Sequence, residues 1–104
     1  MTKDVLPGST SQSYTVQVEM VAKLAEKTIG YEVPKTLEAA TCILVQYFLS
    51  KTRLFSDSPW TYTRCQENVQ GYQTVVGGFA PSGLNVAYCH FGADNRGVAA
   101  LRKL

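Results

Sequence analysis

The sequence predicts a mainly α-helical protein: an antiparallel helical hairpin or bundle with an extended arm or small β-hairpin and a short C-terminal helix. Two stretches between residues 16 and 53 repeat apolar residues at a helical period. A four-residue link joins them, and links this short usually connect antiparallel neighbours. The last ten residues carry a third, shorter apolar ridge. A chain of 104 residues forms one domain, which we predict to comprise a flexible arm (1–13) and a single helical domain (14–104).

The first predicted helix begins near Ser13 or Thr15, because either hydroxyl can cap a helix N-terminus. Its buried stripe is expected to comprise Val18, Val21, Ala22, Ala25 and Ile29. Gly30 is expected to end the helix, since glycine readily adopts the left-handed conformation found after a last helical turn.

The second predicted helix begins at Pro34 and runs to about Lys51. One of its faces carries apolar residues at i, i+3, i+4, i+7, i+8, i+11 and i+12. These residues are Leu37, Ala40, Thr41, Leu44, Val45, Phe48 and Leu49, with Ile43 and Tyr47 on the flanks. We expect this face to be core. Because the rest of the chain is poor in helices that could cover so apolar a segment, we also expect partners to complete its burial.

The second half of the chain changes character. Residues 60–63 alternate aromatic and hydroxyl side chains, which predicts a short strand, and residues 70–76 form a second candidate strand. Residues 84–91 alternate as a strand does, although their length also permits a helical turn. Gly77-Gly78 and Pro81-Ser82-Gly83 are predicted to lie in a loop. Asp94 or Asn95 would cap the final short helix, whose ridge is Val98, Leu101 and Leu104.

Composition excludes several classes of function. A net charge of +2 is too small to argue for nucleic-acid recognition, and no segment has the length of a membrane span or the apolar region of a signal peptide. Three cysteines without metal-ligand spacing favour a reducing compartment. Charged residues make up only 17% of the chain, and aromatic residues are plentiful. This combination favours a surface partly covered by other protein.

Nothing in the sequence predicts catalytic, cofactor-binding or metal-binding residues. Cys89 and His90 are adjacent, and adjacent residues on a strand point to opposite faces, so they would not converge as a nucleophile and base. One histidine and scattered cysteines give too few metal ligands. The aromatic residues Trp60, Tyr62 and Tyr72 could stack bases, but basic residues are not concentrated near them, so a protein interface is the favoured interpretation.

The order of these elements resembles the small head–tail connector (adaptor, or head-completion) proteins of tailed bacteriophages. The resemblance covers most of the chain beyond Tyr14. Its elements are the turn Thr28-Ile29-Gly30, a Pro-x-x-Leu-x-x-Ala helix start at residues 34–40, an apolar run ending in Arg53, a Gly71-Tyr72 element, and a Val-x-x-Leu-Arg segment at residues 98–102. Unlike members of that family, this chain begins with a polar segment, and its segment 77–92 is long.

The resemblance implies a structural virion protein at the head–tail junction, assembled in the host cytoplasm as a ring of about twelve copies. The ring would dock on the portal protein, extend the channel for double-stranded DNA without reading its sequence, and join the next connector or tail protein. No membrane is involved. Portal docking would fall on Val98, Leu101, Arg102 and Leu104. The ring contact is expected to include Trp60, Tyr62 and Tyr72.

Two other interpretations stay open from the sequence. One is a small homo-oligomeric protein-interaction domain of bacterial or mobile-element origin, with helices paired across a two-fold axis. The other is a small enzyme that uses Cys89 or His90.

Overall fold

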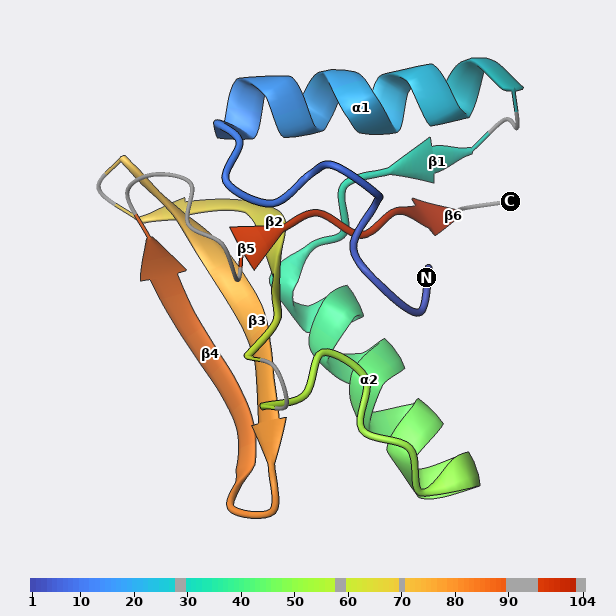
Figure 1. Ribbon diagram of the computed structural model, residues 1–104, viewed down its shortest axis with the longest axis vertical. Coiled ribbons are helices and arrows are strands. Elements are labelled where there is room, and N and C mark those ends of the chain that lie inside the picture. Colours follow the sequence, from blue (N-terminus) through green and yellow to red (C-terminus); the bar gives the residue numbers. More distant parts are fainter. Residues whose placement is uncertain (28–29, 58–59, 70, 90–95, 103–104) are drawn as a thin grey trace.

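The computed structural model describes residues 1–27, 30–57, 60–69, 71–89 and 96–102. Its two helices lie beside an antiparallel sheet of three main strands (Figure 1). The helices are α1 (Tyr14–Lys27) and α2 (Thr36–Ser50), and the main strands are β2 (Tyr62–Val69), β3 (Tyr72–Ala80) and β4 (Gly83–Cys89). Three two-residue strands complete it: β1 (Tyr31–Glu32), β5 (Arg96–Gly97) and β6 (Leu101–Arg102).

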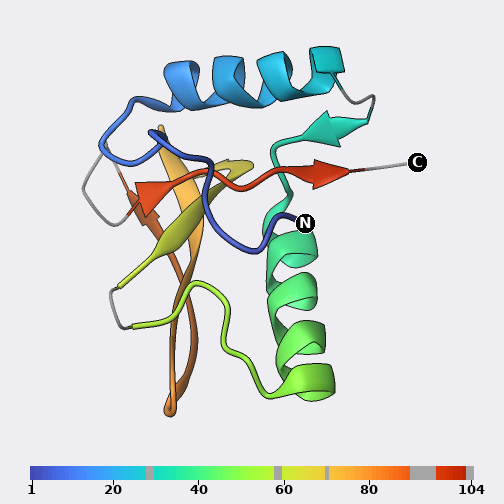
Figure 2. The same cartoon turned by 45° about the vertical axis from the view of Figure 1, so that its right-hand side comes forward.

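The predicted mainly α-helical hairpin or bundle is therefore wrong, because the protein has an α+β fold. The two helices lie at the expected positions but do not pair. α1 runs across one end of the molecule, whereas α2 runs alongside the sheet (Figures 1 and 2). The reason lies in the link between them. Tyr31 and Glu32 form β1, which pairs with β6, and the following Val33 and Pro34 are buried. An extended, buried link cannot act as the tight turn of a helical hairpin.

The sheet has the order β4-β3-β2-β5, in which β2, β3 and β4 are antiparallel neighbours and β5 lies parallel to β2. β2 and β3 join at Gly71, which has a φ of 90° and whose N–H donates to Asn68 Oδ1 at 2.8 Å. Residues 84–88 lie within β4, so their alternation is that of a strand and not of a helical turn.

Gly77 and Gly78 do not form the predicted flexible loop, since both lie buried within β3. A Cβ atom on Gly77 would overlap the backbone of Thr61 and Tyr62. The φ of Gly78 is 56°, and its N–H donates to Thr61 O at 2.9 Å. Glycine is required here because the strand bends, with a register shift between Gly77 and Ala80, while neighbouring backbone approaches closely.

The core has two parts. The larger lies between α2 and the sheet and comprises Ala39, Ile43, Phe55, Cys65, Val76, Phe79 and Ala99. The smaller lies under α1 and comprises Val21, Val33, Val98 and Ala100. The segment 97–100 therefore contributes to both parts and is completely buried.

The predicted C-terminal helix is wrong, because residues 96–102 run as extended chain through the centre of the molecule. Val98, Ala99 and Ala100 are fully buried, and their N–H groups donate to side chains of the domain. Val98 N donates to Ser9 Oγ at 3.1 Å and Ala100 N to Thr2 Oγ1 at 3.0 Å. A segment flanked on several sides by backbone partners cannot coil into a separate helix.

The first ten residues, predicted as part of a flexible arm, lie against this C-terminal segment. Thr2 N donates to Ala100 O at 2.9 Å, and Leu6 N donates to Val98 O at 2.7 Å. Ser9 is fully buried, and its carbonyl accepts from Gln17 Nε2 at 2.7 Å. The two ends of the chain thus hold each other, a pairing of residues almost a hundred positions apart that no local pattern reveals.

Candidate interaction surface

α2 has two apolar faces, and only one of them packs against the rest of the domain. Ala39 and Ile43 are fully buried against the sheet, and Tyr47 packs on Phe79 with ring centroids 5.2 Å apart. Ile43 and Tyr47 were predicted as flanks of the buried face. In the structure they belong to its centre, so the helix is turned by about half a revolution from the predicted orientation.

The opposite face of α2 is exposed. We call it the α2 stripe and define it as Leu37, Thr41, Leu44, Val45, Phe48 and Leu49. Leu37, Phe48 and Leu49 are 77%, 78% and 75% exposed, and Leu44 and Val45 are about half exposed. The prediction that this face is core is therefore wrong for the single chain.

The α2 stripe carries almost no charge. Glu38 is the one charged residue between Thr36 and Ser50, and Lys51 follows at the C-terminal end. Lys51 has left-handed backbone, with a φ of 62°, and its Nζ lies 5.6 Å and 5.8 Å from the ring centroids of Tyr47 and Phe48. Soluble helices normally place charged side chains on their solvent face. Exposed apolar patches of this kind often mark interaction sites, so the α2 stripe is the candidate surface.

The N-terminus of α2 is fixed to the sheet by hydrogen bonds. Glu67 Oε1 accepts from Thr36 N at 2.8 Å and from Thr36 Oγ1 at 2.9 Å. Thr36 Oγ1 lies 2.8 Å from Thr74 Oγ1, and Lys35 N donates to Glu38 Oε1 at 2.9 Å. Burial alone would raise the pKa of Glu67, but the hydrogen bonds from Thr36 outweigh it and lower that pKa. These bonds attach the N-terminus of α2 to β2 and β3.

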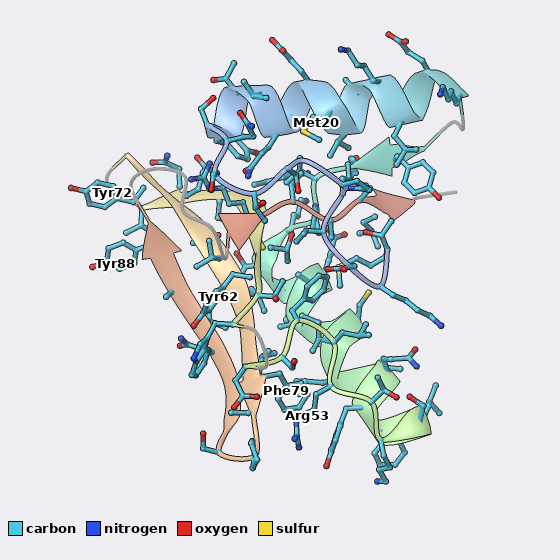
Figure 3. All side chains as sticks on the ribbon, viewed as in Figure 1. Met20, Arg53, Tyr62, Tyr72, Phe79 and Tyr88 are labelled. Carbon is cyan, nitrogen blue, oxygen red and sulfur yellow. The ribbon has the colours of Figure 1, made fainter. Side chains whose placement is uncertain are left out.

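The residues predicted for a ring interface do not form one cluster. Trp60 is half exposed and packs close to Gly78, while Tyr62 Oη accepts from Asn85 Nδ2 at 3.2 Å. Tyr72 stacks on Tyr88 with centroids 5.8 Å apart, on the β4 side of the sheet and away from α2 (Figure 3). Their role at an interface stays a prediction.

The residues predicted to dock on a portal do not form a helical ridge. Val98 is fully buried in this chain's own core, and Leu101 and Arg102 form β6, with Leu101 partly buried. Leu104 lies outside the described residues. Val98 therefore packs within its own domain. This placement agrees with the alternative in which the C-terminal segment belongs to the core and not to a docking site.

α1 also departs from the predicted stripe. Val21 is buried as expected, but Val18 is 40% exposed and Ala22 is exposed. The inward positions are Gln17, Val21 and, partly, Leu24. Periodicity missed Gln17 because it is polar. Besides its bond to Ser9, it accepts from Arg64 Nη1 at 3.2 Å.

Arg64 on β2 is a buried cation, 2% exposed. Its Nη1 also donates to Gln12 O at 3.0 Å, while Nε and Nη2 have no hydrogen-bond partner among the described residues. The guanidinium thus joins β2 to the beginning of α1.

Two further surface features are less specific than the α2 stripe. A groove of about 440 Å³ lies between α1 and β1 and is lined mainly by Tyr14, Val18, Val21, Tyr31 and Val33. β4 is an edge strand on which Val86 and Tyr88 are more than half exposed. Leu37, Phe48 and Leu49 of the α2 stripe are each more exposed than the apolar residues Val18, Val86 and Tyr88 of these two features.

In the described part of the chain, no three or more His, Cys, Asp or Glu side chains lie together where they could hold a metal ion. Burial raises the pKa of the Cys65 thiol to about 12, so this thiol is protonated at neutral pH and is a poor nucleophile. His90 lies outside the described residues, and the enzyme alternative stays a prediction. No described helix has the length and apolarity needed to cross a membrane.

Comparison with known proteins adds no relative: no family model, no curated protein and no solved structure matches this chain.

Proposed function

We propose that this protein is a non-catalytic protein-interaction subunit, and that the α2 stripe is its binding surface. The observation that carries the proposal is the exposure of five large apolar side chains on one nearly uncharged helix face. Monomeric proteins rarely expose contiguous apolar patches beyond about 300–600 Å² unless the patch is functional. The stripe is separate from the inward face of α2, so it is free to bind while the fold stays intact.

A bacteriophage head–tail connector remains the more specific candidate, and it rests on the sequence resemblance. The corrected fold removes one of its supports, since the predicted portal-docking helix is a buried extended segment. Pro34 stands two residues before the first residue of α2, and the apolar run on which the resemblance rests lies within that helix. A ring would need the α2 stripe to meet a different surface of the next subunit.

The proposed surface is tested with the double variant Leu44→Asp/Phe48→Asp. We expect it to keep the circular dichroism and unfolding midpoint of the unmodified chain, because both side chains face solvent in the single chain. We also expect it to lose most of the binding of a hydrophobic fluorescent dye. The matched control is Val16→Asp on α1, which is 37% exposed but lies outside the stripe.

Two results would contradict the proposal. Unfolding of the double variant would place the stripe in the core. Unchanged dye binding and unchanged solution behaviour would mean that the stripe is not a binding surface.

A further inference from the structure

We infer that the partner of the α2 stripe is a second copy of this chain, bound by antiparallel pairing of the two α2 helices across a two-fold axis. This inference rests on the proposed function, since it names the partner of the same surface. The argument uses the charge, the residue sizes and the area of the stripe.

The charge pattern permits the stripe to meet itself. Between Thr36 and Ser50 the only charged side chain is Glu38, so two copies face each other without a row of like charges. A partner recognised by charge would instead require a complementary pattern, and the stripe offers none. Burial of an uncharged apolar face against an identical face is the mode typical of homodimers, whose interfaces are more apolar than other protein–protein contacts.

The sizes of the side chains favour antiparallel pairing. With the two-fold axis near the middle of α2, Leu37 lies opposite Phe48 of the second copy, and Thr41 lies opposite its Leu44. The small Thr41 leaves a gap into which the larger Leu44 can fit, as ridges of one helix fit grooves of another. Parallel pairing would place each large residue opposite the same residue of the second copy. It would also bring the two Lys51 ammonium groups together.

The ends of the helices support the same direction. Glu38 lies in the first turn of α2, and Lys51 follows its last turn. An antiparallel pair brings Glu38 of each copy closer to Lys51 of the other copy than a parallel pair would. It also sets the two helix dipoles in opposite directions, which is the favourable arrangement.

The area is sufficient for a weak dimer. The exposed side chains of the stripe offer apolar area on the order of 600 Å² per copy, so a two-fold contact would bury on the order of 1,200 Å² in total, the lower end of the range for specific interfaces. We therefore expect reversible, concentration-dependent association in the micromolar range rather than an obligate dimer.

A membrane surface is the competing occupant of an exposed apolar helix face. Helices that lie in membrane interfaces usually carry several Lys and Arg residues beside the apolar face. α2 has none between Thr36 and Ser50. The composition of the helix therefore favours a protein partner.

The first experiment measures mass against concentration by light scattering or sedimentation, with the unmodified chain, Leu44→Asp and Val16→Asp. The unmodified chain and Val16→Asp should rise to twice the monomer mass with increasing concentration, whereas Leu44→Asp should stay monomeric. Thr41→Lys repeats the test at an exposed position with a small side chain and should also stay monomeric. It replaces Leu44→Asp if that variant fails to fold.

The second experiment determines the direction of pairing by disulfide trapping, in a chain with Cys42→Ser and Cys89→Ser. A mixture of Leu37→Cys and Phe48→Cys chains should form the mixed disulfide in preference to either self-linked product. Preferential self-linking of each variant would indicate parallel pairing and would overturn the antiparallel arrangement.

Failure of this inference differs from failure of the proposed function. An unmodified chain that stays monomeric at all concentrations, yet loses dye binding in Leu44→Asp/Phe48→Asp, overturns the second copy as partner and leaves the surface in place. Association into rings overturns the two-fold pairing. A monomer that sediments with vesicles of phosphatidylglycerol and phosphatidylcholine, and is released by Leu44→Asp, assigns the stripe to a membrane instead.

Discussion

The two helices place their apolar side chains in different ways. α1 places Val21 and part of Leu24 inward and exposes charged residues on its other side, namely Glu19, Lys23, Glu26 and Lys27. α2 buries Ala39 and Ile43 and exposes an apolar stripe to solvent. α1 therefore has the charged solvent face of an ordinary surface helix, whereas the solvent face of α2 is apolar.

The difference shows what a helical period does and does not determine. Apolar residues repeat at a spacing near 3.6 on both helices, which identifies each as a helix. On α1 the charged side chains mark the solvent face. On α2 almost no charges exist to mark it, so the larger apolar stripe was assigned to the core, and the smaller face of Ala39 and Ile43 was missed.

Aspartate on the two faces of α2 should produce the largest contrast. Ile43→Asp buries an unpaired carboxylate against the sheet and should cost about 4 kcal/mol or more, enough to unfold a marginally stable domain. Leu44→Asp, at the neighbouring half-exposed position, should change the unfolding free energy of the single chain by about 1 kcal/mol or less. Urea unfolding followed by circular dichroism measures both, at a concentration where the unmodified chain is monomeric.

Equal destabilisation by these two variants would reject the assignment of inner and outer faces. The Ile43→Val variant is the matched control for the buried position, since it removes a single methylene and should cost about 1 kcal/mol.

The sequence was informative about local elements and much less so about how they meet. The helices at residues 14–27 and 36–50 and the strands near residues 62, 72 and 84 follow from period, caps and glycines that act within a few residues. The contacts of Thr2 and Leu6 with residues 98–100 join the two ends of the chain, and no short window contains both partners. The interaction surface was present in the sequence as an apolar stripe, but its exposure depends on which face the sheet covers.

Alanine substitutions at inner and outer positions of α1 should differ in their cost to the unfolding free energy, but by less than the aspartate substitutions on α2. Val21→Ala removes fully buried apolar surface beside Val33 and Val98 and should cost about 2 kcal/mol. Val18→Ala, at a position 40% exposed, should cost less than about 1 kcal/mol. The same urea titration measures both. A larger cost for Val18→Ala would mean that the groove between α1 and β1 is more tightly packed than this arrangement allows.

The two cysteines near α2 should differ in reactivity rather than in stability. Cys42 is a partly exposed free thiol on α2, and Cys65 is fully buried beneath it, with a pKa raised to about 12 by burial. Because the thiolate is the reacting form, Cys42 should react with a maleimide at mildly alkaline pH, while Cys65 should react only after unfolding. Mass spectrometry of proteolytic peptides identifies the labelled residue. Labelling of Cys65 in the folded chain at the rate of Cys42 would show that α2 separates readily from the sheet.

The smallest effect should appear in acid, at the carboxylate that holds the start of α2. Hydrogen bonds from Thr36 lower the pKa of Glu67 from its ordinary value of 4.5 against the opposing effect of burial. Because the folded state favours the ionised form, its stabilising contribution is complete above that ordinary value and is lost as the pH falls through the lowered pKa. Glu67 is largely exposed, so solvent screening should keep the contribution below about 1 kcal/mol.

The measurement compares urea midpoints at neutral pH and below pH 4.5 for the unmodified chain, Glu67→Gln and the exposed α1 variant Glu26→Gln. At neutral pH we expect Glu67→Gln to be slightly less stable than the unmodified chain, and on acidification the two should converge. Glu26→Gln should follow the unmodified chain at both pH values, because Glu26 is exposed and its side chain has no hydrogen bond within the described part of the chain. A constant gap between Glu67→Gln and the unmodified chain at both pH values would assign the loss to packing of the side chain rather than to its charge. In that case the N-terminus of α2 would be held mainly by the Thr36–Thr74 contact.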